Sequence, residues 1–351
     1  ELFQNRLSEF QSRNRDITLE IRVKAIQGVG GLLDSLTSAS AAAPDALPDL
    51  VALPRDLLEA AALKGLLIPL DDLTNALNEV DWFPYALEMA NLQDNIYGFP
   101  FAGDALVQVY HTESITNPLT SWSAVLNSTS TLIFNAAGED ALFTLAQYQA
   151  NDNPVQDDQG RPYLNVEELA EVLSFYQTAA QTGIVPGELL ASLQNYDLVW
   201  QVFSENRADA AITWASRYLQ NRNEGIAVAQ IPTMGGQSFT LATGWSLALV
   251  GRREESRRAA INLAEFLTDS HFLADWSYAA GYLPTRPSSL ELWPDLAVKE
   301  DIRKIATASR LQPSIDIRAS LEPPLQHAVM SAISGQATPL SAAQTAGASL
   351  M

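Results

Sequence analysis

The chain alternates between short apolar runs and amphipathic stretches of helical length. Apolar positions 3, 7 and 10 predict a helix at the start, and a further helix is expected from about residue 32. Between them ITLEIRV, residues 17–23, alternates apolar and polar side chains strictly, which predicts a half-buried strand. LPDLVAL, residues 47–53, is a short apolar run bounded by prolines, as buried parallel strands are. Such an alternation of strands and helices is typical of an α/β layer fold.

The rest of the chain continues this alternation. A helix is expected over residues 57–64 with Gly65 as its C-cap, and another over residues 254–267. A third follows Asn165, whose spacing to Glu168 indicates a capping box. Further strands are predicted in three stretches, namely ADAAITWAS, GIAVAQIP and GWSLALV. The acidic stretch at residues 151–160 is expected to be a solvated loop, and the tail from residue 321 is helix-prone.

One segment, NIYGFPFAGDALVQVYHTESI at residues 95–115, has a mixed pattern. It is strand-like at both ends, but its middle holds Gly98, Pro100, Gly103 and Asp104, which central strands avoid. The pattern predicts two strand pieces separated by a break. Asp104 is the best candidate in the chain for a buried acid, because it lies among apolar residues.

Composition narrows the class of partner. The chain has 351 residues, which is more than one core of ordinary size accommodates and predicts two lobes. Its formal net charge of −20 repels phosphate backbones, so nucleic acid is an unfavourable partner. A small neutral or cationic ligand remains compatible with this charge.

Signatures of catalysis and of cofactors are missing from the sequence. There is no cysteine, so thiolate catalysis and thiolate metal sites are excluded, and the three histidines are scattered. No phosphate-binding loop, dinucleotide fingerprint or zinc-protease motif occurs, and we expect no cofactor and no metal. No signal segment is recognisable in this numbering, and we expect the native amino terminus to lie upstream.

Five sequence blocks, in order, resemble the extracellular solute-binding proteins of family 1, the sugar-binding type of ABC importers. The blocks are LPDLVALPRDLLEAAALKGLLIPLDDL, NIYGFPFAGDALVQVYHTESI, VLSFYQTAAQTGIVP, FSENRADAAITWAS, and the long stretch from IAVAQIP to GYLPTR. His111 stands where this family usually has Asn, and Asn206 where it usually has Gly. The first strand, which often helps to hold the ligand, is not recognisable.

The resemblance implies a two-lobed α/β fold of the type II periplasmic-binding-protein class, similar to maltose-binding protein, with a ligand cleft between the lobes. Lobe one would comprise residues 1–107 and 240–294, and lobe two residues 108–239 and 295–351. In this reading the chain crosses between lobes at the interrupted 95–115 segment. The implied function is capture of a small ligand, a mono- or oligosaccharide in this family, by hinge closure, and its delivery to the permease subunits of an ABC importer. The protein would be an extracytoplasmic monomer, periplasmic or lipid-anchored, and not an enzyme.

The resemblance also implies which residues line the cleft. Aromatic rings cover the apolar faces of sugars, while acidic, basic and amide groups meet the hydroxyl groups. The expected ligand-binding residues are Trp245, Trp214, Asp104, Tyr282, Phe101, Arg286 and Gly244. The other tryptophans at positions 82, 122, 276 and 293 are read as packing residues, and Arg286 can equally hold a structural salt bridge.

Several alternatives remain open from sequence. The same fold could bind a polyamine or another small cation, and an acidic site around Asp104 would favour that ligand class. A ferric-ion site would need a cluster of tyrosines, which is not evident. A carbohydrate-active enzyme would need two carboxylates at catalytic separation. A sensor component using this fold is not distinguishable from an importer component.

Overall fold

The computed structural model describes residues 1–251 and 253–350. The chain forms two compact units, each discontinuous in sequence. Unit 1 consists of Glu1–Asp104 and Thr243–Lys299, and unit 2 of Ala105–Ala242 and Glu300–Met351. The chain therefore passes from one unit to the other three times, within β4 (Phe99–His111), β8 (Thr240–Leu249) and α14 (Leu296–Ala308).

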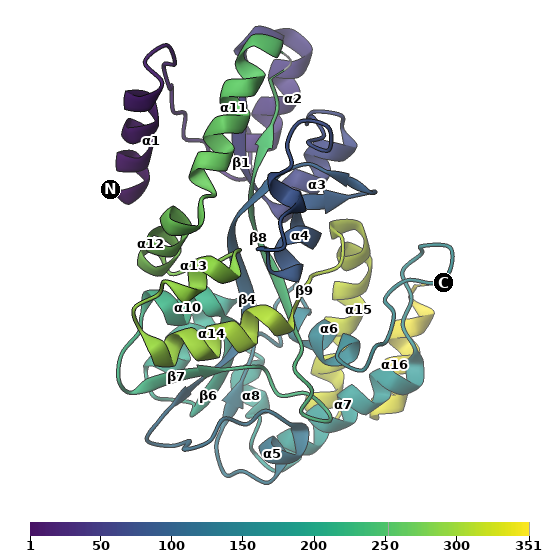
Figure 1. Ribbon diagram of the computed structural model, residues 1–351. Coiled ribbons are helices and arrows are strands. Elements are labelled where there is room, and N and C mark those ends of the chain that lie inside the picture. The colour runs from purple at the N-terminus through teal and green to yellow at the C-terminus, as the bar shows by residue number, and fades with distance from the viewer. Residues whose placement is uncertain (252, 351) are drawn as a thin grey trace. The chain divides into compact units, whose positions relative to one another are not determined.

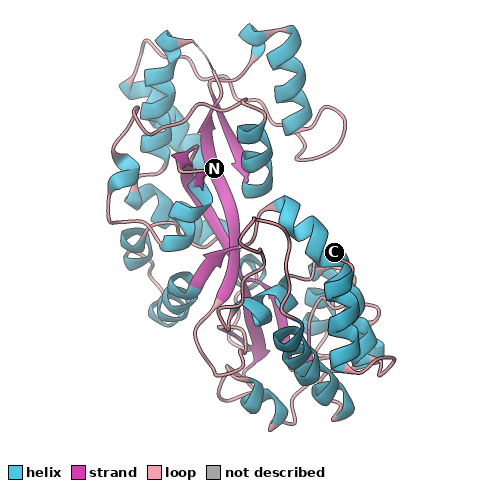
Figure 2. Cartoon of the chain, turned by 90° about the vertical axis from the view of Figure 1, so that its right-hand side faces the viewer, coloured by secondary structure: helices cyan, strands magenta, loops and turns pink. Residues whose placement is uncertain are grey.

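Unit 1 is built from short strands with helices around them (Figures 1 and 2). Its helices are α1 (Leu2–Arg13), α2 (Leu32–Ala42), α3 (Arg55–Leu63), α4 (Pro84–Ala90), α11 (Glu254–Leu267), α12 (Ser270–Ala280) and α13 (Pro287–Glu291), with the 3-10 turns η1 (Pro44–Ala46) and η2 (Ala76–Asn78). Its strands are β1 (Leu50–Pro54), the hairpin of β2 (Asn91–Leu92) and β3 (Asn95–Ile96), and the adjoining parts of β4 and β8. β1 pairs antiparallel with the second half of β8, so that Leu50 lies opposite Leu249.

Unit 2 has a sheet and a helical layer. Its helices are α5 (Trp122–Leu126), α6 (Leu142–Gln149), α7 (Val166–Gln181), α8 (Gly187–Leu190), α9 (Tyr196–Ser204), α10 (Ala215–Gln220), α15 (Ile315–Ile333) and α16 (Pro339–Ala348). Its strands are β5 (Leu132–Ile133), β6 (Ala210–Trp214), β7 (Ile226–Ala229), β9 (Ser309–Leu311) and the remaining parts of β4 and β8. β4 pairs antiparallel with β6 and β7, whereas β5 runs parallel to β6.

Helices α7, α15 and α16 pack against one another in unit 2 (Figure 1). Two buried rings of α7 stack on rings from other segments. Phe175 stacks on Trp122 with centroids 4.9 Å apart, and Tyr176 stacks on Phe134 with centroids 5.0 Å apart. Burial of such large rings dominates the hydrophobic free energy of a core. Trp122 is therefore a packing residue, as the sequence predicts.

Most predicted elements are confirmed. The helix at residues 254–267 has the expected bounds as α11, the predicted strands occur as β1, β6, β7 and β8, and residues 151–160 contain neither helix nor strand. The expected buried parallel strand at residues 47–53 is wrong in character, because β1 pairs antiparallel with β8 and is mostly partly exposed. Asn206, which stands where the resembled family has glycine, adopts the left-handed conformation with φ 57°. Asn tolerates this region better than most residues, which accounts for the exchange.

The predicted break in the 95–115 segment is wrong. β4 is one continuous strand of 13 residues that includes Pro100, Gly103 and Asp104. Gly103 is required here because a Cβ at this position would lie 2.1 Å from the hydroxyl oxygen of Tyr85. Its backbone N–H donates to Leu283 O and its carbonyl accepts from Leu283 N–H, so the glycine serves close packing within a strand. The small residues thus mark the closely packed part of β4 that belongs to unit 1. This part of the strand ends at Asp104, after which β4 continues into unit 2.

The predicted strand at residues 17–23 is also wrong. This stretch contains no helix and no strand, and it forms no ladder with another strand of the described chain. Ile17 and Leu19 pack against the core of unit 1, whereas Val23 is 92% exposed. Only the first apolar residues of the alternating pattern are packed. A strand also needs a neighbouring strand to hydrogen-bond with, and an alternating sequence does not guarantee one.

The capping box at α7 is half correct. The Asn165 side chain accepts hydrogen bonds from the backbone N–H groups of Glu167 and Glu168, as an N-cap should. The reciprocal bond is replaced, because the N–H of Asn165 donates to the Tyr148 hydroxyl at 2.8 Å. The Glu168 carboxylate instead accepts from the Asn153 amide at 3.3 Å.

Among the described residues, no helix combines the length and apolar character that crossing a bilayer requires.

Candidate functional site

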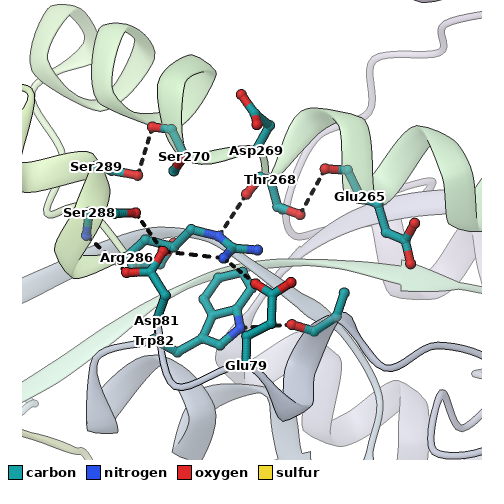
Figure 3. Close-up of polar contacts among 12 residues, drawn as sticks. Glu79, Asp81, Trp82, Glu265, Thr268, Asp269, Ser270, Arg286, Ser288 and Ser289 are labelled. Atoms are coloured by element: carbon teal, nitrogen blue, oxygen red, sulfur yellow. Dashed lines mark hydrogen bonds and ion pairs between the residues drawn. The ribbon is translucent and has the colours of Figure 1, made fainter.

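Arg286 lies at the centre of a polar network in unit 1 (Figure 3). It is the N-cap residue of α13, and only 8% of it is exposed. Its Nε donates to the carbonyl of Thr268 at 2.8 Å, and its Nη1 lies 2.7 Å from the Glu79 carboxylate. Its guanidinium carbon stands 3.8 Å from the centre of the Trp82 ring, a cation–π contact. The structure therefore engages this cation with protein groups on several sides.

The same network fastens three segments together. Asp81 lies 3.4 Å from Arg286 Nη1 and accepts a hydrogen bond from the backbone N–H of Ser288 at 2.9 Å. The Ser289 hydroxyl donates to the carbonyl of Ser270 at 2.9 Å. The loop before α4, the start of α12 and the start of α13 are thus held by hydrogen bonds and ion pairs, which is the salt-bridge alternative considered for Arg286.

An open pocket of about 730 Å³ lies over this network. Its lining residues are Thr74, Asn75, Ala76, Glu79, Asp81, Glu265, Asp269, Ser270 and Arg286. Four carboxylates and one guanidinium give the lining a formal charge of 1 − 4 = −3. Such a lining attracts cations, but among the described residues no group of three or more metal-ligating side chains is arranged to hold a metal ion.

Aromatic side chains form a second feature of unit 1. The Trp276 and Tyr282 rings stack in parallel with centroids 5.7 Å apart, and Trp276 also contacts Phe101 at 4.3 Å. Phe101 belongs to the core cluster and is 7% exposed, whereas Trp276 and Tyr282 are partly exposed. The ligand roles of Phe101 and Tyr282 stay predictions, and Tyr282 presents the more accessible ring.

The other predicted residues of unit 1 lie on the strands that leave it. Trp245, in β8 opposite Pro54 of β1, is partly exposed and packs against the core at its edge. A Cβ at Gly244 would lie 2.1 Å from the carbonyl oxygen of Ala102, so this glycine allows two backbones to approach closely. Asp104 is half-buried. Burial of Tyr85, and then the negative charge of the nearby Asp104, raise the pKa of the Tyr85 hydroxyl.

Unit 2 contributes the remaining predicted residue, Trp214, and a polar cluster that sequence reasoning missed. Trp214 ends β6, is partly exposed, and meets the ring of Tyr196 edge-on with centroids 5.5 Å apart. Asn135 follows the parallel neighbour β5, and its Nδ2 donates to Asp140 Oδ1 at 2.7 Å. Carboxyl ends of parallel strands are where open α/β sheets bind ligands.

Asp140 has an unusual electrostatic environment. Burial, followed by the negative charge of Glu322, raises the pKa of this carboxyl from 3.8 to about 7, against the opposing effects of Asn135, Tyr196 and Arg318. Burial and the Asp140 charge in turn raise the pKa of the Tyr196 hydroxyl well above its usual value. A carboxylic acid that titrates near neutrality can act as a hydrogen-bond donor or an acceptor, depending on pH.

A sequence signal for this cluster existed but was weak. Asn135 follows directly on the apolar run LIF, and a polar residue after a buried strand is the pattern expected at the ligand edge of a parallel pair. A two-residue strand such as β5 is too short for periodicity to reveal, and Tyr196 and Asp140 reach the cluster only through tertiary packing.

The comparisons with known proteins agree on the fold. The sugar-binding protein MalE from Xanthomonas citri superposes with a TM-score of 0.81 at 17% identity, covering 99% of this chain and 92% of that one. A cyclo/maltodextrin-binding protein complexed with maltotetraose gives a TM-score of 0.80 at 19% identity, with coverage of 99% and 92%. UgpB from Mycobacterium tuberculosis, in complex with glycerophosphocholine, gives 0.72 at 17% identity, with coverage of 99% and 93%.

Sequence comparison identifies the family of the chain but no individual relative. No curated protein sequence matches the chain. The model of the bacterial extracellular solute-binding protein family matches residues 5–304, which is most of the chain. The α/β fold and the two units accompany that match, and the family consists of binding proteins. The chain therefore belongs to the bacterial extracellular solute-binding protein family.

Proposed function

We propose that the protein captures a mono- or oligosaccharide outside the cytoplasm and delivers it to the permease subunits of an ABC importer. The observation that carries this proposal is the presence of a partly exposed tryptophan in each unit. In unit 1, Trp245 packs against the same core cluster as the stacked rings of Trp276 and Tyr282, and in unit 2 Trp214 lies against the ring of Tyr196.

This combination of side chains suits a sugar. Pyranose rings present apolar C–H faces that pack on aromatic rings, and hydroxyl groups that exchange hydrogen bonds with carboxyl and amide groups. Two solved structures with this fold are of proteins that bind maltotetraose and maltose, respectively. Their identity to this chain is below 20%, so they support the sugar class and leave the particular sugar open.

The mechanism we propose is ligand-dependent hinge closure. The chain passes between its units at three points, after Asp104, Ala242 and Lys299, and each lies inside a strand or helix. A ligand that makes more contacts in a closed form shifts the population toward that form, and periplasmic binding proteins are a standard example of such hinge motion. The permease would then recognise the closed form, and we propose that the protein acts as a monomer, soluble or anchored at the outer face of the membrane.

A cationic solute is the second candidate. The chain carries a formal charge of −20, and the pocket over Arg286 has a lining charge of 1 − 4 = −3. UgpB, which shares the fold, is known in complex with glycerophosphocholine, a solute with a cationic head group. We would therefore expect a polyamine or a choline-type ligand to bind at the acidic pocket over Arg286, and not at the exposed tryptophans.

A thermal-stability screen tests the proposal. The purified chain would be heated with maltose, maltotriose, other mono- and oligosaccharides, spermidine, choline and amino acids. A ligand present at 100 times its Kd stabilises the native state by about 2.7 kcal/mol, which raises Tm by a few degrees. We expect a sugar to raise Tm and Trp245→Ala to abolish the effect.

The matched control is Tyr163→Ala, because Tyr163 is an aromatic residue with 41% exposure in another part of unit 2. This variant should keep the sugar-dependent rise in Tm. A rise with spermidine or choline and none with sugars would replace the carbohydrate assignment by the cationic one. A rise with no member of the panel would reject both ligand classes.

A further inference from the structure

A short turn of unit 1, residues 281–286, is fastened to strand β4 by backbone hydrogen bonds. Gly281 ends α12 in the left-handed conformation with φ 73°, which leads the chain out of the helix. Leu283 then exchanges two hydrogen bonds with Gly103, at 2.9 Å and 2.8 Å between nitrogen and oxygen, as an antiparallel bridge. In an antiparallel pair the residue before one partner lies opposite the residue after the other. The bridge therefore places Tyr282 and Asp104, two predicted ligand residues, opposite each other.

Tyr85 of α4 supports this bridge from its buried side. Its hydroxyl donates to the carbonyl of Pro284 at 2.9 Å, and the residue is 0% exposed. The same hydroxyl lies against β4, because a Cβ on Gly103 would stand 2.1 Å from its oxygen. One buried side chain thus contacts both segments that the bridge joins.

Thr285 makes a second tie between the turn and β4. Its hydroxyl donates to the carbonyl of Pro100 at 3.2 Å, and its own carbonyl accepts from the backbone N–H of Phe83 at 3.0 Å. Thr285 is 0% exposed, as Tyr85 is. Neither side chain is accessible to a ligand, so any influence on binding has to pass through the residues that they hold.

The hydroxyl of Tyr85 remains a hydrogen-bond donor over the whole range of a binding assay. Burial, followed by the negative charge of Asp104, raises the pKa of this hydroxyl above its ordinary value of 10.0. The bond to Pro284 is therefore present on both sides of neutral pH, and its contribution should not depend on pH in that range.

We propose that Tyr85 is a positioning residue for sugar binding, which holds the 281–286 turn against β4 and so fixes Tyr282 and Asp104 relative to each other. This inference rests on the proposed function and adds to it a residue that does not touch the ligand. The ring of Tyr282 stacks on Trp276 with centroids 5.7 Å apart, so the turn also sets the position of that aromatic pair.

The physical basis is preorganisation of the binding residues. A segment that is already ordered before the ligand arrives loses less conformational entropy on binding. Tyr85→Phe keeps the ring but leaves the buried carbonyl of Pro284 without its donor, which favours opening of the turn. Part of the binding free energy would then be spent on ordering the turn, and the affinity falls.

The experiment measures Kd by calorimetric titration with the sugar that raises Tm most in the thermal screen. Tyr85→Phe should increase Kd by about fivefold, the equivalent of one hydrogen bond, and by the same factor on either side of neutral pH. Thr285→Val, which removes the bond to Pro100 with little change of shape, should change Kd in the same direction.

The matched control is Tyr148→Phe in unit 2. Tyr148 is also 0% exposed, and its hydroxyl donates to a proline carbonyl, that of Pro154, at 3.1 Å. Both tyrosine variants should lower the Tm of the ligand-free chain, because each loses a buried hydrogen bond. Only Tyr85→Phe should also raise Kd, whereas a purely structural role would lower Tm in both variants and leave Kd unchanged in both.

Amide hydrogen exchange gives a second readout that needs no ligand. The backbone amides of Gly103 and Leu283 should exchange faster in Tyr85→Phe than in the wild type, and at the wild-type rate in Tyr148→Phe. A wild-type Kd or unchanged exchange of these two amides in Tyr85→Phe overturns the inference while sugar binding itself stands. If the wild type binds no sugar, the proposed function fails and the inference fails with it.

Discussion

Asn135 Nδ2 donates a hydrogen bond to Asp140 Oδ1 over 2.7 Å, in a segment where the next glycine leaves no room for a side chain. This pair connects the strand edge of unit 2 to a carboxyl group whose pKa is raised to about 7. The relationship has consequences for stability.

Asp140→Asn should change how stability depends on pH. Because the pKa of Asp140 is higher in the folded chain than its ordinary value of 3.8, the folded state binds this proton more tightly. The contribution of Asp140 is therefore fully present below about pH 4 and is lost as pH rises to about 7. Urea unfolding at pH 5 and pH 8 should show that the variant gains stability relative to the wild type at pH 8, by about 2–4 kcal/mol. Equal effects at both pH values would contradict this.

Arg286→Ala should destabilise unit 1 strongly. The variant removes the cation that pairs with Glu79 and Asp81 and the donor to the Thr268 carbonyl. Because the two carboxylates are partly exposed, we expect a loss of about 1.5–3 kcal/mol. Arg253→Ala is the matched control, because its ion pair with Asp49 is largely exposed and is expected to contribute below about 1 kcal/mol. Urea unfolding measures both variants, and similar losses for the two would show that burial of Arg286 is not decisive.

Gly244→Ala should also destabilise the chain, by about 1–3 kcal/mol or more. The added methyl group would lie 2.1 Å from the Ala102 carbonyl oxygen and 2.7 Å from the Met89 sulfur, so strand β8 would have to shift. Gly225→Ala is a suitable comparison, since its new methyl group would approach nothing closer than 3.4 Å. Thermal unfolding should rank the variants in that order, and an unaltered Tm for Gly244→Ala would refute the close approach.

Asn165→Ala and Glu168→Ala should differ at the start of α7. Asn165 accepts from two backbone N–H groups, so its replacement should cost about 1 kcal/mol. Glu168 makes no return bond to the Asn165 N–H, which is already paired with the Tyr148 hydroxyl, so Glu168→Ala should have a smaller effect. Equal losses in urea unfolding would point to a complete capping box instead.

Local patterns predicted much of the fold because local physics determines it. The bounds of α11 follow from its amphipathic repeat, and Asn165 was recognisable as a cap from its own chemistry. The failures concern tertiary partners. Residues 17–23 alternate but find no neighbouring strand, and Gly103 reads as a break although it accommodates the ring of Tyr85.

The candidate site was predictable only in part, for the same reason. Trp214 and Trp245 could be selected because they lie in sequence blocks that resemble the solute-binding family, and their ligand roles stay predictions. Asp140 and Tyr196 could not be selected in this way. The raised pKa of the Asp140 carboxyl depends on its burial and on Glu322, which lies far away in the sequence. Such an environment exists only in the folded unit.

The most direct test of the account is a calorimetric titration of wild type, Trp214→Ala and Trp245→Ala with the sugar that raises Tm most. The account predicts saturable binding of the sugar to the wild type with one site per chain. It predicts a loss of at least tenfold in affinity for each tryptophan variant, with Tyr163→Ala unchanged. Sugar binding that survives both replacements, or tight binding of spermidine in place of any sugar, would contradict it.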